Sequence, residues 1–292
     1  MNKIKESVIQ QILFFSAVIT VLTTLGIVLV LLVEAINFFK EVPLIDFLTD
    51  TEWTPLFAQK HFGILPLLSG TLLITFIAIS VALPIGLSIA IFLSEYVPDK
   101  FRGTIKPLLE LLAAVPTVVY GFFALMVVAP FLQGFIPGMS GFSSLSAGIV
   151  MGIMIIPYIS SLSEDALRAV PSKLREASYG MGSTRFQTAF RVVLPAASSG
   201  VIVSIILAIS RAVGETMIVA IAAGQQPRLT LNPLVPIETI TAYIVQVSLG
   251  DVPYGSLEYR TIFSAGITLF VFTFILNNIS FFIRKKFQQR YD

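Results

Sequence analysis

The sequence contains no cysteine and a single histidine, His61, and these shortages exclude several kinds of chemistry. Without cysteine there is no thiol nucleophile, no disulfide and no cysteine metal ligand. His61 follows Gln59 and Lys60 in a polar connection, where we interpret it as a solvated residue. No Gly-x4-Gly-Lys-Ser/Thr phosphate-binding loop occurs either, so the chain has no nucleotide-binding motif of this kind. We therefore expect no metal site, no cofactor and no catalytic residues.

Charged residues are also scarce. They make up 12% of the 292 residues, while hydrophobic residues make up 55%. Soluble domains usually contain about 25% charged residues, so this depletion predicts an integral membrane protein. The net charge of +2 is too small to indicate a nucleic-acid partner.

Six apolar stretches are long enough to cross a bilayer as helices, which takes roughly 20 residues. They lie at about 12–33, 67–93, 108–132, 143–162, 196–223 and 262–283. The first exceeds the roughly 7–15 apolar residues of a signal-peptide core, so we interpret it as a retained span. The pattern predicts an all-α integral membrane protein with six transmembrane helices, forming a single domain over residues 1–292.

Lysine and arginine are distributed unequally between the two sides that six spans define. Fourteen lie on the side of the chain ends and in the connections on that side. The opposite side has four, which are Lys40, Lys60, Arg228 and Arg260. Cytoplasmic loops of membrane proteins carry the excess of positive residues. Both termini and the connection 164–195 are therefore predicted to be cytoplasmic.

Two connections on the outer side are longer than a turn requires. Residues 34–66 are rich in aromatic side chains, namely Phe38, Phe39, Phe47 and Trp53. This composition is typical of a segment that lies in the membrane interface. Residues 224–260 contain apolar residues at helical spacing, namely Ile237, Ile240, Ile244 and Val247. They predict a helix of about 14 residues, too short to span, that lies on the outer surface or dips partway into the membrane.

The polar cytoplasmic connection 164–195 predicts two short helices joined by a turn. Ser172 is placed to cap the first helix, and Thr184 is placed to cap the second. Gly180 and Gly182 lie between them and allow the chain to turn. The second helix carries on one face Phe186, Ala189, Phe190 and Val193. A helical projection with an exposed apolar face is typical of a docking element.

The same connection resembles the EAA loop of ABC-transporter permeases, whose pattern is Glu-Ala-Ala, three residues, Gly, nine residues and Ile-x-Leu-Pro. The matching residues are Glu176, Ala177, Gly182, Leu194 and Pro195, with Ser178 and Val192 as mild departures. The resemblance implies a bundle of the type I ABC importer permease kind. It also implies that the loop inserts into a cleft of a cytoplasmic ATP-binding subunit, with Glu176 and Gly182 as the main coupling residues. ATP hydrolysis would then be supplied by that partner, and the chain itself would not be an enzyme.

Arg211 and Glu215 lie near the middle of the fifth apolar stretch. A charged side chain at mid-membrane costs roughly 2.5–3.5 kcal/mol on insertion scales. An i,i+4 pair on a helix returns only about 0.2–0.5 kcal/mol, so local helix stability does not explain the two charges. Either they hold neighbouring helices together or they contact a charged solute. The same stretch carries a ridge of small residues that predicts close helix packing, namely Gly200, Ser204, Ala208 and Ala212.

Three segments resemble the phosphate permeases of the Pst system. They are Ser210-Arg-Ala-Val-Gly-Glu-Thr-Met217, Pro116-Thr-Val-Val-Tyr-Gly121 and Thr51-Glu-Trp-Thr-Pro55. The resemblance extends from about residue 3 to residue 287 and is closer to the C-type than to the A-type subunit. It implies a bacterial inner-membrane location and transport of inorganic phosphate. The implied partners are a homologous second permease, cytoplasmic ATP-binding subunits, an extracytoplasmic phosphate-binding protein and the lipid bilayer.

The chemistry of the charged pair fits a phosphate pathway. The planar guanidinium of Arg211 suits a tetrahedral oxyanion. Glu215 moderates the positive field, and it can accept a hydrogen bond from the proton that hydrogen phosphate carries and sulfate lacks. Thr117 and Tyr120 are further pathway candidates, although hydroxyls in membrane helices more often bond to backbone carbonyls or to other helices.

Several alternatives remain open at this point. The solute could be another oxyanion such as sulfate or molybdate, or the chain could be the A-type phosphate subunit. An intramembrane hydrolase that uses Glu215 would need paired acids, a His–Ser arrangement or a metal cluster within the spans, and the sequence shows none of these. A non-transporting anchor or signalling subunit would give the intramembrane charges no purpose.

The predicted topology can be tested with single cysteines, because the chain has none of its own. An impermeant thiol reagent applied to intact cells should label a cysteine at Gln59 or Gln225, which are predicted to be outside. The same reagent should miss a cysteine at Ser183. Labelling at Ser183 would contradict the topology.

Overall fold

The computed structural model of the protein describes residues 3–287. The remaining residues, 1–2 and 288–292, lie outside the described part, and the predicted cytoplasmic termini and Arg290 lie there with them. The regular secondary structure of the described part is helical, apart from two isolated bridges, Trp53 with Phe62 and Gly224 with Ile237. The prediction of an all-α membrane protein is confirmed.

Four helices are long and apolar enough to cross a membrane. They are α1 (Lys3–Glu41), α3 (Leu65–Glu95), α7 (Ser144–Arg168) and α14 (Leu257–Phe287). Each covers its predicted stretch to within one residue and extends beyond it. The other two predicted stretches are bent, so the described chain has six spans only if each bent pair of helices counts as one.

The third predicted stretch, 108–132, is not one straight helix. Its first part belongs to α4 (Asp99–Ala114), which makes an angle of 79° with the run Thr117–Gln133. That run consists of α5 (Thr117–Phe123), η1 (Ala124–Val128) and α6 (Ala129–Gln133). The chain turns at Val115, whose ψ of 129° is extended, because the ring of Pro116 disfavours the helical conformation in the residue before it.

The fifth predicted stretch, 196–223, is also interrupted. The run Arg185–Ala196 meets α11 (Ser198–Val213) at an angle of 74°. At its other end α11 stops at Val213, and three residues separate it from α12 (Met217–Ala222). Arg211 and Glu215 therefore lie on either side of a helix end, and the prediction that they share one continuous helix is wrong.

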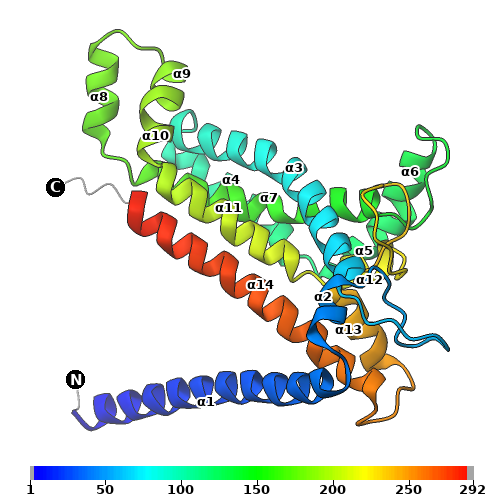
Figure 1. Cartoon of the computed structure of the whole chain (residues 1–292). Helices are drawn as coiled ribbons and strands as arrows, with labels where there is room; N and C mark the ends of the chain where they lie inside the picture. Colours follow the sequence, from blue (N-terminus) through cyan, green and yellow to red (C-terminus); the bar gives the residue numbers. More distant parts are fainter. Residues whose placement is uncertain (1–2, 288–292) are drawn as a thin grey trace.

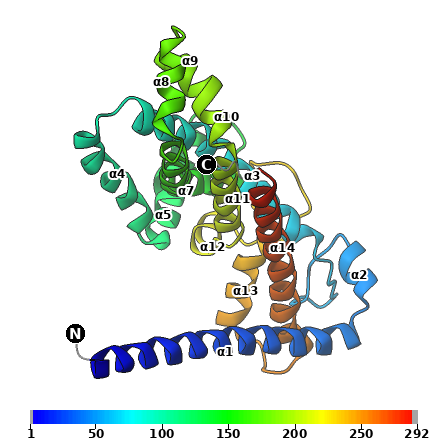
Figure 2. The ribbon, with the colours of Figure 1, turned by 90° about the vertical axis from the view of Figure 1, so that its left-hand side faces the viewer.

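Close contact between α3 and α7 forms the centre of the bundle. A Cβ atom added to Gly152 of α7 would lie 2.8 Å from the carbonyl oxygen of Ala78 on α3, so only glycine allows this approach. α11 packs onto the same core through its predicted ridge, of which Ser204, Ala208 and Ala212 are at most 3% exposed. The ridge prediction is therefore confirmed. Figures 1 and 2 show α1 as a long arm that leaves this core and passes beside α14.

The outer connections pack together into a compact cap. Phe38, Phe47 and Trp53 are at most 1% exposed. Trp53 meets Tyr243 of α13 (Ile240–Leu249) edge to face, with ring centroids 4.9 Å apart. These three side chains therefore pack on one another and on α13, while the membrane-interface position of the segment stays a prediction. The predicted 14-residue helix is real but has 10 residues, since Ile237 lies before it in the bridge with Gly224.

The two sides of the molecule can be followed in Figure 1. The start of α1, the end of α14 and the projection formed by α8 (Ser172–Gly180) and α9 (Arg185–Thr188) lie towards the left of the view. The cap, with α2 (Leu44–Thr49) and α13, lies towards the right. This arrangement agrees with the side assignments made from the positive charges.

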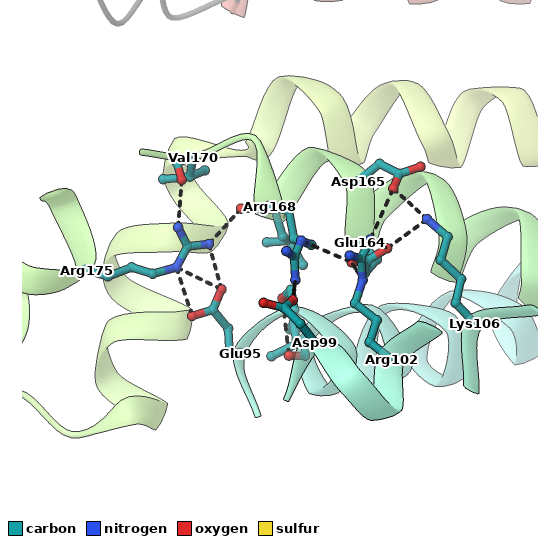
Figure 3. Close-up of polar contacts among 12 residues, drawn as sticks. Glu95, Asp99, Arg102, Lys106, Glu164, Asp165, Arg168, Val170 and Arg175 are labelled. Carbon is teal, nitrogen blue, oxygen red and sulfur yellow. Dashed lines mark hydrogen bonds and ion pairs between the residues drawn. The ribbon is translucent and has the colours of Figure 1, made fainter. Parts of the chain in front are cut away.

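A buried carboxylate ties the flanking helix α4 to α7 (Figure 3). The side chain of Glu164 on α7 is 0% exposed. Its Oε1 lies 2.6 Å from Nε of Arg102, and its Oε2 accepts a hydrogen bond of 2.8 Å from Nζ of Lys106. Nearby, Arg168 of α7 pairs with Asp99 of α4 at 2.8 Å. The buried carboxylate of Glu164 is therefore the centre of a group of four charged residues from α4 and α7, namely Asp99, Arg102, Lys106 and Arg168.

A second ion pair in the same region holds the base of the projection. Arg175 of α8 binds both carboxylate oxygens of Glu95 at the end of α3, at 2.8–3.2 Å. Its remaining donors reach the carbonyl oxygens of Val170 and Leu167 at 2.6 and 2.8 Å (Figure 3). The guanidinium therefore fixes the first helix of the projection to the bundle.

Replacing Glu164 with glutamine should destabilise the protein strongly. It leaves the mostly buried cations of Arg102 and Lys106 without their shared anion, and breaking a buried pair typically costs about 3–5 kcal/mol. The matched control is Asp165→Asn, because Asp165 also contacts Lys106 but its side chain is 57% exposed. An exposed pair contributes about 0–1 kcal/mol. Thermal unfolding of the purified variants measures both, and equal effects would contradict the role of the buried carboxylate.

Candidate functional site

The charged pair is built at the gap between α11 and α12. Arg211, in the last turn of α11, donates from Nη1 to Oε2 of Glu215 at 2.8 Å. The other oxygen of Glu215 accepts from the backbone N–H groups of Met217 and Ile218 at 3.1 and 3.4 Å. These are among the first N–H groups of α12, which have no partner within the helix. One carboxylate thus pairs with the arginine and caps the next helix.

The local sequence explains why the helix stops here. Gly214 is a poor helix former, and it occupies the position immediately after α11. Glu215 follows directly, and a carboxylate is favourable near the N-terminal end of a helix. The Arg-Ala-Val-Gly-Glu-Thr segment therefore encodes a helix end, a turn and a helix start within six residues.

The two members of the pair differ in accessibility. The side chain of Glu215 is 2% exposed, whereas that of Arg211 is 35% exposed. A guanidinium has five N–H donors, so the arginine can bind Glu215 and still present donors to an anion. Tyr158 of α7 lies beside the same guanidinium. The sequence did not single out this tyrosine, because the same stretch also contains several serine hydroxyls.

The outer cap supports the gap from the other side. Thr241, in the first turn of α13, donates from its hydroxyl to the carbonyl oxygen of Glu215 at 2.6 Å. The neighbouring backbone N–H of Ile240 donates to the hydroxyl of Thr71 on α3 at 3.2 Å. The position of the pair therefore depends on α11, α12, α13 and α3 together. Nothing in the sequence linked Thr241 to Glu215, because 26 residues separate them.

The two hydroxyl candidates of the third stretch have other surroundings. Tyr120 is 7% exposed, and its hydroxyl donates to the backbone carbonyl of Leu112 at 2.7 Å. A bond to a backbone carbonyl is the commoner role of a hydroxyl group in a membrane helix. Thr117 is the first residue of α5 and is half-buried. The structure thus brings Arg211 and Glu215 together, and it gives Tyr120 a bond to the backbone of α4.

The projection of α8 and α9 has the predicted helix–turn–helix form. α8 ends at Gly180, and Gly182 has a φ of +83°, a conformation that favours glycine. Thr184 and Gln187 form a reciprocal capping box at the start of α9. The prediction that Ser172 caps α8 is wrong. Pro171 occupies the cap position without a side-chain bond, and Ser172 is the first residue of the helix.

The residues that match the EAA pattern are mostly accessible. Glu176, Ala177, Gly182 and Pro195 are exposed, whereas Leu194 is half-buried. Ser178, which departs from the family pattern, bonds through its hydroxyl to Thr188 of α9 at 2.9 Å. Ser178 therefore links the two helices of the projection.

The apolar side chains of the second helix divide into two groups. Ala189 and Val193 are at most 1% exposed and pack towards the bundle. Phe186 and Phe190 are 62% and 43% exposed, and their ring centroids are 4.6 Å apart. The prediction of a single exposed face is therefore wrong for the two small residues. Met181 in the turn is 87% exposed, so the projection still offers apolar side chains for docking.

Comparison with solved structures supports the fold. A permease chain of a bacterial alginate ABC transporter, crystallised with an alginate-bound periplasmic protein, matches with a TM-score of 0.61 at 16% identity, covering 94% of each chain. A chain of the inward-facing methionine transporter MetNI matches with a TM-score of 0.56 at 19% identity, covering 78% of this chain and 95% of that one. At these identities the likeness concerns the fold alone, which is that of type I ABC importer permeases.

Comparison with curated proteins identifies nearer relatives. The probable ABC transporter permease protein YqgH of Bacillus subtilis is 35% identical over 261 residues, covering 89% of this chain and 84% of the relative. Two phosphate transport system permease proteins PstC follow. The one from Mesorhizobium japonicum is 35% identical, covering 84% of this chain and 80% of its own length. The one from Haemophilus influenzae is 34% identical, covering 84% and 82%.

The family assignment follows from a match that includes both candidate sites. Residues 82–292 match the model of the binding-protein-dependent transport system inner membrane component. This region contains the gap with Arg211 and Glu215 and the whole cytoplasmic projection. The chain therefore belongs to the family of inner membrane components of binding-protein-dependent transport systems, and it is a multi-pass membrane permease.

Proposed function

We propose that the protein is a permease subunit of an ATP-driven importer of inorganic phosphate. The observation that carries the proposal is the Arg211–Glu215 pair, an arginine with an accessible guanidinium at a gap between two helices of a transport permease. Relatives named as phosphate transport permeases at 34–35% identity support phosphate as the solute. Half of the translocation pathway would come from this chain and half from a homologous second permease.

Phosphate fits the pair better than sulfate or molybdate does. Arg211 offers a planar set of donors to a tetrahedral anion. Glu215 holds a carboxylate beside it, and a fully deprotonated oxyanion would meet that carboxylate without a proton to share. Hydrogen phosphate carries such a proton. The names of the relatives also favour the C-type over the A-type subunit.

The cytoplasmic projection is the proposed contact with a separate ATP-binding subunit. It stands clear of the bundle and presents exposed Met181, Phe186 and Phe190. At its base, Arg175 is bonded to Glu95 of α3, so a displacement of α8 would be transmitted to the bundle through this ion pair. An extracytoplasmic phosphate-binding protein would deliver the solute to the opposite, outer side, and both termini would lie in the cytoplasm.

The first test removes both charges of the pair. Single replacements decide little, because each leaves a buried or half-buried charge unpaired. In the double variant Arg211→Met with Glu215→Gln, the amide oxygen still accepts from the N–H of Met217, so the cap of α12 is kept. If the pair only joins helices, the variant should assemble and transport normally. If it contacts phosphate, uptake should fall by about tenfold or more, equivalent to losing roughly 1.4 kcal/mol of stabilisation.

Radiolabelled phosphate uptake by the reassembled complex in vesicles, normalised to the amount of complex, measures this effect. Co-purification of the ATP-binding subunit serves as the control for assembly. Uptake close to wild type would contradict the pathway role of the pair.

The second test concerns the turn of the projection. Gly182→Val should distort it, because a β-branched residue strongly disfavours a φ of +83°. Gly180→Val is the matched control, since Gly180 lies two residues away and, like Gly182, has no atom within 4 Å of an added Cβ, but its φ is not positive. We expect Gly182→Val to insert in the membrane and to lose solute-stimulated ATP hydrolysis. Gly180→Val should retain most of it.

Co-purification with the ATP-binding subunit and the rate of ATP hydrolysis are the two measurements. If both were unchanged in Gly182→Val, the projection would not be the docking element.

A further inference from the structure

The outer cap contains a cavity that the proposed pathway residues do not line. Its volume is about 270 Å³, and it lies between the loop after α2, the loop after α12 and α13. Its walls include Trp53, Phe57, Gln225, Glu238, Tyr243 and Gln246. The lining is mostly aromatic and amide, with one carboxylic acid.

That acid, Glu238, is buried without a partner for its charge. It is 1% exposed, and its Oε1 has no hydrogen-bond partner. No lysine or arginine is among the described residues that line the cavity. Burial raises the pKa of Glu238 to about 8. Burying an unpaired carboxylate costs free energy, so such a group is either protonated or pairs with a cation when one binds.

The other groups around Glu238 do not supply that cation. Tyr243 of α13 has its pKa raised by burial and stays neutral. From α3, the residues against this segment are Gly70 and Thr71, which carry no charge. At the gap between α11 and α12, Glu215 is already bound to Arg211. Arg228, next to the lining residue Pro227, donates to Oε1 of Gln226 at 2.8 Å, and none of the ion pairs among the described residues includes Glu238. A positive group for Glu238 would therefore come from another molecule.

The lining favours a cation over an anion. Aromatic rings attract an ammonium or guanidinium group, and a carboxylate completes such a site. An oxyanion would need fixed positive charge, which the lining residues lack, and it would lie against the carboxylate of Glu238. The wider outer surface has the same bias, because the connections 34–66 and 224–260 contain eight acids and four bases. Two of those bases are already paired, Lys60 with Glu258 and Arg260 with Glu41.

We propose that this cavity receives the end of a lysine or arginine side chain from the extracytoplasmic protein that delivers the solute. The inference rests on the proposed function, which supplies such a partner. The acidic outer connections attract a basic surface over a distance, and the cavity then takes one side chain of that surface. Glu238 gives up its proton when the cation enters.

The position of Glu238 connects the cavity to the charged pair. Its carbonyl oxygen is pressed against α3, so that a Cβ atom added to Gly70 would lie 2.2 Å from it. Three residues further on, the hydroxyl of Thr241 holds the carbonyl oxygen of Glu215 at 2.6 Å. A partner that binds Glu238 therefore acts on the gap where Arg211 and Glu215 meet, because only the short segment from Glu238 to Thr241 lies between the two.

The chain has a built-in reporter for the test, since Trp53 in the cavity wall is its single tryptophan. The purified complex is titrated with N-acetyl-arginine methylamide while Trp53 emission is followed. N-acetyl-citrulline methylamide, a neutral molecule of the same shape, is the ligand control. Variant Glu238→Gln removes the carboxylate. Asp251→Asn is the matched control, because it removes one negative charge from an exposed position of the same connection, outside the cavity.

The expected result is a saturable emission change with the arginine compound and none with the citrulline compound. Affinity should rise as the pH increases from 6 to 9, because Glu238 ionises with a pKa of about 8 in the empty cavity. Glu238→Gln should weaken binding by about tenfold or more and abolish the pH dependence, as expected for a close charge pair. Asp251→Asn should retain both. Glu238→Asp, which keeps the charge, should retain part of the binding if Glu238→Gln is impaired only electrostatically.

A second measurement uses the partner itself. Stimulation of ATP hydrolysis by the phosphate-loaded binding protein should need a several-fold higher concentration of that protein in Glu238→Gln, with a similar maximal rate. The inference would be overturned by equal arginine affinity in wild type and Glu238→Gln. It would also be overturned if phosphate alone changed Trp53 emission and bound less well as the pH rose, which would make the cavity an anion site. These outcomes are independent of the uptake test on the Arg211 pair.

Discussion

Backbone polar groups inside a membrane must find partners within the protein, and this constraint governs two of the places where the helices of this permease break. At the gap after α11, the carboxylate of Glu215 accepts from the first N–H groups of α12, while the hydroxyl of Thr241 bonds to the carbonyl of Glu215. At the bend before α5, the hydroxyl of Tyr120 bonds to the carbonyl of Leu112 on α4. Polar side chains in the spans therefore allow the irregular backbone that a pathway needs.

The charged pair follows from the same constraint. A carboxylate that caps α12 has to be buried, and a buried carboxylate is stable only beside a positive group. Arg211 provides that group at 2.8 Å, and its partly exposed side chain leaves donors facing outwards. A structural need and a role in binding an anion are thus compatible in one pair. Removing both charges while keeping the cap separates the two roles.

Three regions along the bundle are joined by short polar contacts. The projection is fixed to α3 through Arg175 and Glu95, and α4 is fixed to α7 through Glu164 (Figure 3). On the outer side, Thr241 joins the cap to the gap at Glu215. The proposed contact with the ATP-binding subunit and the proposed docking cavity are therefore both connected to the same packed helices, α3, α7 and α11. This is the arrangement expected where ATP hydrolysis on one side controls solute entry on the other.

Local patterns in the sequence were enough to predict much of this protein. The apolar stretches located the four spans that are single helices, because a helix that crosses lipid needs an uninterrupted apolar run. Thr184 and Gln187 encode their own capping box, and Gly182 encodes the turn, since both depend only on neighbouring residues. The spacing of Glu176, Gly182 and Pro195 led to the family, which the match over residues 82–292 confirmed.

Other features were decided only by the tertiary structure. The stretches 108–132 and 196–223 look continuous because apolar composition carries no information about a bend at Pro116 or a gap at Gly214. From composition alone, Phe38, Phe47 and Trp53 resemble residues that lie in a membrane interface. Packing on one another and on α13, far along the chain, buries their side chains. The link from Thr241 to Glu215 and the isolation of Glu238 also depend on segments that meet only in the folded chain. Composition and local spacing determine which helices form, whereas contacts between distant segments determine where they break and which charges remain unpaired.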